Sequence, residues 1–214
     1  GLEGRVCEMN REGAALSLKA AGQVAKVFAS LGPTGKILAA GEVDPSEVRF
    51  AFAEQAKVLA SAGVFALVLE TFSELEEALL ALAAAKETGL PVAACMAFDS
   101  GKNLDRTMMG TTPEECGERL ASGGADAVGA NCGQGPENLA RIGKRMAAAS
   151  GLPLWLKPNA GKPRLEGNRI RYDVTPEDFA ASASSLLGAG ASFVGGCCGT
   201  TPAHILALGR VLRG

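Results

Sequence analysis

Short apolar runs recur along the chain, and each is followed by a longer stretch in which apolar residues keep a helical spacing. The runs contain few polar residues, which is typical of strands buried on both faces of a parallel sheet. Six runs are visible, at residues 27–31, 65–69, 91–98, 127–130, 153–156 and 192–194. The intervening stretches predict helices at residues 45–62, 73–88, 113–122, 136–150 and 176–188. The pattern therefore predicts an alternating α/β protein.

Capping residues mark the starts of several predicted helices. Asp44, Thr112 and Thr175 each precede a proline and stand three residues before an acidic residue. This arrangement places a side-chain oxygen near the free N–H groups of a first helical turn. Two further helices are predicted, one over residues 11–25 before the first strand and one that begins at Pro202.

Repeated strand–helix units fit either an open doubly wound sheet or a (β/α)8 barrel. Successive strands begin 26 to 39 residues apart, close to the unit of roughly 30 residues in a barrel of about 250. Residues 32–35, after the first strand, lack the G-x-G-x-x-G spacing of a dinucleotide-binding sheet. We therefore predict a (β/α)8 TIM barrel, present as one domain over residues 1–214. Because only six units are visible and a helix comes first, we expect the first two strand–helix units to be missing.

Composition narrows the classes of partner. The chain has 214 residues, with 21 basic and 23 acidic side chains and 47% apolar residues. Such a balanced charge argues against nucleic acid or a membrane surface as a partner. No apolar run approaches the ~20 residues of a spanning helix and no signal segment opens the chain, so we expect a cytoplasmic protein. The six cysteines are too few for a disulfide scaffold, and we expect thiols, with core positions for Cys7, Cys95 and Cys116.

The candidate reactive groups are the first polar residues after each apolar run, because barrel enzymes carry their sites at the C-terminal ends of strands. These residues are Glu70, Asp99, Asn131, Cys132, Lys157, Asn159, Cys197 and Cys198. Three thiolates from neighbouring strand ends suit Zn2+ with an open fourth position. Cys197 and Cys198 can share one ion only if the strand pleat is broken, which the glycines around them permit. We therefore predict a metal site at Cys132, Cys197 and Cys198.

Other interpretations of these residues are open. Glu70 ends an apolar strand, so it is either a salt-bridged barrel residue or a group that faces a ligand cation. Asn159 lies in a segment rich in proline and glycine, where asparagine commonly shapes a loop. Residues 195–202 also resemble a glycine-rich helix N-terminus that binds a phosphate or carboxylate.

Several motifs together resemble the homocysteine S-methyltransferase family. They are G-A-N-C at residues 129–132, P-N-A-G-K-P at 158–163 and G-G-C-C-G-T-T-P at 195–202, with matching segments in order at 31–35, 69–72 and 96–99. Within the family, the homocysteine-binding module of cobalamin-dependent methionine synthases is the most similar. The resemblance spans the chain, but the Asp-Gly motif that ends the family's first strand is missing here.

The resemblance implies a zinc-dependent (β/α)8 methyltransferase. Zinc would be bound by Cys132, Cys197 and Cys198, and Glu70 would act as the catalytic residue that contacts the amino group of homocysteine. We also assign Asn159, from the second motif, to the substrate-binding site. The implied reaction methylates the thiol of homocysteine and gives methionine.

The resemblance is compatible with several methyl donors. Methylcobalamin with methyltetrahydrofolate, betaine and a sulfonium are the candidates, and methylcobalamin would come from another domain or protein. The expected partners are homocysteine, the donor, a corrinoid protein and a chain that supplies the missing barrel strands. Two alternative functions remain, a non-catalytic zinc- or thiol-binding subunit of a corrinoid methyltransfer complex and a barrel enzyme that binds a phosphorylated substrate at residues 195–202.

Overall fold

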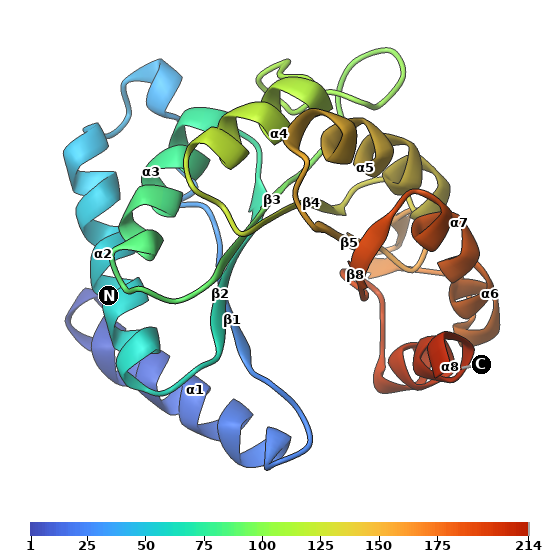
Figure 1. Cartoon of the computed structure of the whole chain (residues 1–214), viewed down its shortest axis with the longest axis horizontal. Helices are drawn as coiled ribbons and strands as arrows, with labels where there is room; N and C mark the ends of the chain where they lie inside the picture. The colour runs from blue at the N-terminus through green and yellow to red at the C-terminus, as the bar shows by residue number, and fades with distance from the viewer. Residues whose placement is uncertain (214) are drawn as a thin grey trace.

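The computed structural model describes residues 1–213 and shows one curved parallel sheet with helices around its outer side (Figure 1). In spatial order the strands are β1 (Phe28–Leu31), β2 (Ala66–Phe72), β3 (Val92–Met96), β4 (Ala127–Cys132), β5 (Leu154–Pro158) and β8 (Ala191–Val194). All neighbouring pairs are parallel. The predicted α/β fold is confirmed as a partial TIM barrel in which each of the six apolar runs forms a strand.

Eight α-helices cover the described part of the chain. They are α1 (Val6–Ala21), α2 (Pro45–Ser61), α3 (Leu75–Lys86), α4 (Pro113–Ser122), α5 (Pro136–Ser150), α6 (Pro176–Ala181), α7 (Ala183–Gly188) and α8 (Pro202–Arg213), with short 3-10 helices at Glu3–Arg5 and Leu38–Ala40. Asp44, Thr112 and Thr175 cap α2, α4 and α6 as predicted, since their side chains accept N–H groups of the first turn. No helix within residues 1–213 is long and apolar enough to cross a membrane.

Three elements differ from the prediction. The helix expected over residues 11–25 is α1, which begins at Val6 and ends at Ala21, before Gly22. The single helix expected over residues 176–188 is divided into α6 and α7 at Ser182, whose hydroxyl donates back to the Phe179 carbonyl. Serine hydroxyls compete in this way with the backbone ladder of a helix. An antiparallel hairpin of β6 (Arg164–Glu166) and β7 (Arg169–Arg171) follows β5 and was not predicted.

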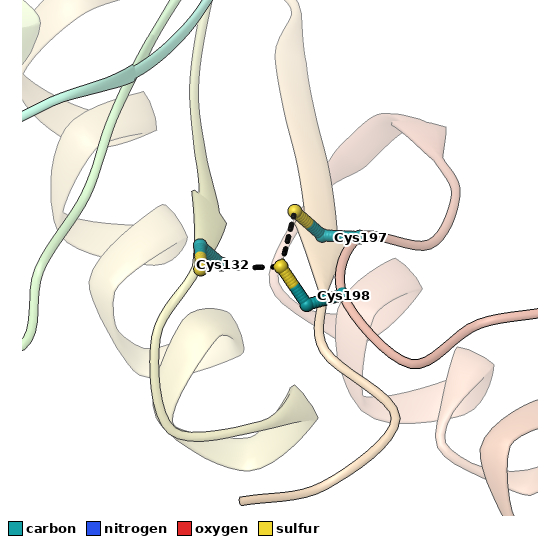
Figure 2. Close-up of side chains that lie close together, drawn as sticks. All are labelled: Cys132, Cys197 and Cys198. Carbon is teal, nitrogen blue, oxygen red and sulfur yellow. Dashed lines mark hydrogen bonds between the residues drawn. The ribbon is translucent and has the colours of Figure 1, made fainter. Parts of the chain in front are cut away.

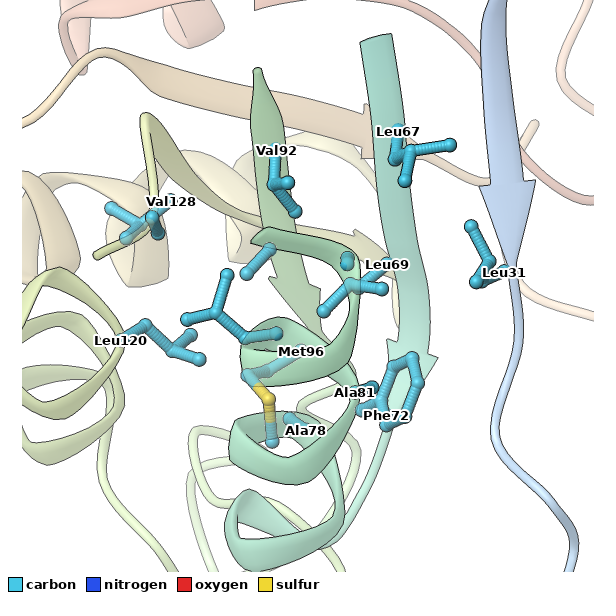
Figure 3. Close-up of a cluster of buried hydrophobic side chains, with 14 of the residues drawn as sticks. Leu31, Leu67, Leu69, Phe72, Ala78, Ala81, Val92, Met96, Leu120 and Val128 are labelled. Atoms are coloured by element: carbon cyan, nitrogen blue, oxygen red, sulfur yellow. The ribbon is translucent and has the colours of Figure 1, made fainter. Parts of the chain in front are cut away.

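The main core lies between the sheet and the helices that cover it. Buried side chains from the strands and from α3 and α4 fill this layer (Figure 3); they include Leu31, Leu67, Leu69, Phe72, Ala78, Ala81, Val92, Met96, Leu120 and Val128. Close packing here fixes the register of the strands. Their C-terminal ends are therefore held at one rim.

A smaller cluster occupies the concave face of the sheet, where Phe28 and Trp155 pack against buried residues of β2, β3 and β4. The Trp155 ring stacks on Phe193 with centroids 4.8 Å apart and lies 5.2 Å from Phe28. β1 and β8 each pair on one side only within residues 1–213. These aromatic rings therefore connect the two edge strands across the concave face.

The three cysteines predicted for the core occupy two kinds of position. Cys95 and Cys116 are buried, and burial raises the pKa of both, that of Cys116 to about 12. They remain protonated at neutral pH. Cys7 is exposed on α1, so its predicted core position is wrong. The reason is that α1 buries a single residue, Ala14, and leaves most of its surface in solvent.

Candidate metal centre

Three thiols meet at the C-terminal rim of the sheet, as the sequence predicted (Figure 2). Cys132 ends β4, and Cys197 and Cys198 lie in the loop between β8 and α8. The Cys198 sulfur is 4.0 Å from the sulfurs of both other cysteines, and all three atoms lie within 4.8 Å of one another. Ligands at about 2.3 Å from a tetrahedral zinc ion would be ~3.8 Å apart. The cluster therefore has the spacing needed to hold one metal ion.

The backbone leaves the strand pleat at both cysteine segments. Cys132 has a φ of 67°, a left-handed conformation that is uncommon outside glycine. The glycines directly after Cys132 and Cys198 are also left-handed, with φ values of 75° for Gly133 and 80° for Gly199. β8 ends at Val194, so Cys197 and Cys198 belong to a loop rather than a strand. This is the break in the pleat that the surrounding glycines were expected to permit.

Asn159 connects the two cysteine segments from the loop after β5. It is 2% exposed. Its Nδ2 donates to the Gly133 carbonyl at 3.0 Å and contacts the Cys132 sulfur at 3.5 Å, while its Oδ1 accepts the Cys198 N–H at 2.9 Å. Asn159 therefore shapes the loop and holds two of the thiols in place, and its contact with a substrate stays a prediction.

Asn131 is a site residue whose role was not predicted. It is 1% exposed, and its Oδ1 accepts the Thr71 N–H at 2.8 Å. Its Nδ2 donates to the Thr71 hydroxyl at 2.7 Å and contacts the Cys197 sulfur at 3.6 Å. It therefore joins the end of β2 to the metal loop. The sequence signal that could have indicated this role is an asparagine directly before Cys132, at the end of an apolar run.

The thiols influence one another's ionisation. The nearby Cys197 thiol, helped by the Asn159 amide, lowers the pKa of Cys132 to about 7. The proximity of Cys132, together with burial, raises the pKa of Cys197. Because thiolates rather than thiols bind metals, Cys132 is already partly in its ligating form at neutral pH.

Glu70 is in the ion-paired arrangement that the sequence allowed. Its Oε1 accepts from Lys157 Nζ at 2.5 Å and its Oε2 from the Ser30 hydroxyl at 2.7 Å. The Glu70 and Lys157 side chains are 16% and 25% exposed. The pair is therefore open to solvent on one side, and contact of Glu70 with a substrate stays a prediction.

Replacing Asn131 with alanine is expected to weaken metal binding. Partners that orient metal ligands typically contribute 10- to 100-fold in affinity, so we expect the zinc affinity to fall by about that factor. Competition with a chromophoric chelator measures it. The control is Asn138→Ala on α5, which removes an asparagine bonded to the Leu104 carbonyl away from the cysteines. Equal zinc affinities for the two variants would contradict a positioning role for Asn131.

Sequence comparisons with known proteins point to one family. A sequence model described as homocysteine S-methyltransferase matches residues 1–212. Methionine synthase of Mycobacterium tuberculosis is 26% identical over 211 residues, which cover 94% of this chain and 18% of that protein. Betaine–homocysteine S-methyltransferase 1 of Bos taurus is 32% identical over 192 residues, which cover 78% of this chain and 44% of that protein. The chain thus spans less than half the length of these two relatives.

Solved structures support the same fold. The metallated form of the homocysteine methyltransferase MmuM from Escherichia coli matches with a TM-score of 0.71 and 23% sequence identity. The match covers 97% of this chain and 68% of that one. The six-stranded sheet and its helices therefore correspond to about two thirds of a known structure.

Proposed function

The chain belongs to the homocysteine S-methyltransferase family, and from this premise we propose that it methylates the thiol of homocysteine to give methionine. In this proposal residues 1–214 act as one homocysteine-binding domain, with zinc held by Cys132, Cys197 and Cys198. The observation that carries the proposal is the spacing of the three sulfurs, with two pairs at 4.0 Å.

The chemistry explains why three thiols would be gathered here. Methyl transfer forms a bond between the sulfur of homocysteine and the methyl carbon, breaks the bond from that carbon to the donor, and releases the thiol proton. A free thiol has a pKa near ~8.5 and is mostly protonated at neutral pH. When bound, zinc supplies the positive charge that keeps a coordinated thiol deprotonated. A set of three cysteines leaves one ligand position for the substrate.

The residues around the cysteines have positioning roles in this proposal. Asn159 holds the Cys132 and Cys198 segments together, and we place it at the substrate-binding site. Glu70 supplies a carboxylate at the same rim for the substrate ammonium group. The Glu70 and Asn159 side chains are held by hydrogen bonds with residues of neighbouring strands or loops, which favours a fixed orientation of the substrate.

The methyl donor can be identified by an assay with labelled candidates. Zinc-loaded protein would be given homocysteine with methylcobalamin, betaine or S-methylmethionine, each with an isotopically labelled methyl group. We expect labelled methionine by mass spectrometry from one donor, and none from the triple serine variant of Cys132, Cys197 and Cys198. The control is Cys7→Ser, which changes an exposed thiol on α1 and should leave the product yield unchanged.

Binding measurements with homocysteine, zinc and sugar phosphates, made beside the donor assay, separate the alternatives. Homocysteine binding without methyl transfer from any donor would indicate the non-catalytic subunit of a corrinoid methyltransfer complex. Binding of sugar phosphates without metal would favour the phosphate interpretation of residues 195–202. The loop gives the phosphate interpretation little support, because the N–H groups of Cys197, Cys198 and Thr201 already donate within the protein. Absence of both zinc and homocysteine binding would contradict the proposed function.

A further inference from the structure

Ser30, Glu70 and Lys157 form a polar layer on the concave face of the sheet. Each of the three stands two residues after a member of the concave-face cluster; these members are Phe28, Val68 and Trp155. Because alternate residues of a strand point to the same face, the three polar side chains also lie on the concave face. The layer therefore lies between the aromatic cluster and the C-terminal rim. Glu70 and Lys157 belong to strands that are not neighbours, so the curvature of the sheet brings them together.

The ion pair leaves hydrogen-bonding capacity unused. A lysine ammonium has three donors and a carboxylate about four acceptor positions. In the described residues the ammonium of Lys157 donates to Glu70, and the carboxylate accepts from Lys157 and Ser30. A ligand that carries one carboxylate and one ammonium group can therefore bind without breaking the ion pair. Its carboxylate would face Lys157 and its ammonium group would face Glu70. The ammonium and carboxylate of an amino acid supply such a pair with no net charge.

The ion pair lies next to the cysteine cluster. In the register of β4 and β5, Lys157 is opposite Asn131, and the next pair is Cys132 with Pro158. Lys157 also lines a cavity of about 510 Å³, together with Gly195, Gly196 and mainly apolar residues of β8, α7 and α8. A Cβ on Gly195 would lie 3.2 Å from the Lys157 side chain. The absence of a side chain at Gly195, two residues before Cys197, therefore leaves room beside Lys157.

We propose that Lys157 is the specificity-determining residue that binds the α-carboxylate of the substrate, while Glu70 takes its ammonium group. The inference rests on the proposed function and deepens it, because it defines the substrate class as α-amino acids that carry a thiol, not thiols in general. Lys157 and Glu70 bind the charged head, and the cysteine cluster receives the sulfur end of the same molecule.

Calorimetric binding of three thiols to the zinc-loaded protein tests this. The thiols are homocysteine, 3-aminopropane-1-thiol, which lacks the carboxylate, and 4-mercaptobutanoate, which lacks the ammonium. Each analogue lacks one of the two charged groups that would be hydrogen-bonded, so the parent should bind homocysteine roughly 10- to 100-fold more tightly than either analogue. Lys157→Met should lose this factor for the two carboxylate-bearing thiols and keep its affinity for 3-aminopropane-1-thiol. Lys157→Arg should restore most of the loss.

Further variants keep the test decisive. Glu70→Gln should show the mirror-image pattern, losing affinity for the two thiols that carry an ammonium group. The double variant Glu70→Gln with Lys157→Met leaves no unpaired charge, and should bind homocysteine no better than the analogues. Lys144→Met, at an exposed position on α5, is the control and should match the parent.

The outcomes distinguish the inference from the function on which it rests. If Lys157→Met weakens the binding of all three thiols by the same factor, or of none, Lys157 does not bind the carboxylate. The inference is then overturned while the proposed function stands. If the zinc-loaded parent binds none of the thiols, both fail.

Discussion

Cys132→Ser is expected to reduce the zinc content of the purified protein from about one equivalent to nearly none. A serine hydroxyl stays protonated at neutral pH and is a poor zinc ligand, so the substitution removes one of three protein ligands. It also removes the sulfur that lies 4.0 Å from Cys198 and 3.5 Å from Asn159 Nδ2. Elemental analysis after reconstitution under reducing, oxygen-free conditions and gel filtration measures the loss. Methyl transfer is expected to disappear with the metal.

The control for this result is Cys7→Ser, because Cys7 is an exposed thiol outside the cluster. It should retain the zinc content of the parent. The unfolding temperature of both variants should be recorded, so that loss of metal is not confused with loss of the fold. A folded Cys132→Ser protein that keeps a full equivalent of zinc would show that the three thiols do not hold the metal.

Gly129→Ala is expected to destabilise the protein by several kcal/mol, out of a total that is typically about 5–15 kcal/mol. Gly129 lies in β4 directly opposite Trp155 of β5. A Cβ at this position would lie 1.9 Å from the Trp155 carbonyl oxygen and 2.8 Å from the carbonyl carbon. Both are backbone atoms, so the clash is relieved only if β4 and β5 separate. Soluble yield and thermal unfolding followed by circular dichroism measure the effect.

Gly13→Ala provides the matched control for the glycine substitution. Gly13 lies inside α1, and no atom stands within 4 Å of the Cβ that alanine would add. Alanine favours helix over glycine, so we expect a gain of about 0.5–1 kcal/mol. If the Gly129→Ala variant had the same unfolding temperature as the parent, the close approach of β4 and β5 at Gly129 would be contradicted.

The secondary structure of the sheet could be predicted because parallel strands covered by helices consist almost entirely of apolar residues. The run at residues 91–98 became β3 (Val92–Met96), whose five residues are all buried. The hairpin of β6 and β7 was missed because all six of its residues are exposed and no buried face gives it an apolar pattern. Its sequence did contain a signal, since Gly167 and Asn168 fill a two-residue turn.

The candidate site could be predicted in part. The cysteines were identified because thiols at neighbouring strand ends combine an unusual residue type with a position where barrels carry reactive groups. The pairing of Glu70 with Lys157 was not predicted, since the two residues are 87 positions apart and meet only when the sheet curves. The role of Asn131 was missed for a similar reason, because its contacts with Thr71 and Cys197 span 60 and 66 positions.

Trp155 gives the protein an intrinsic optical reporter. It is the single tryptophan of the chain, and its ring lies between Phe28 of β1 and Phe193 of β8, the two edge strands. Indole emission shifts in wavelength and intensity when neighbouring rings move or solvent approaches. The fluorescence of the unlabelled protein should therefore follow the separation of the two edges of the sheet in real time, as ligands or other polypeptides are added.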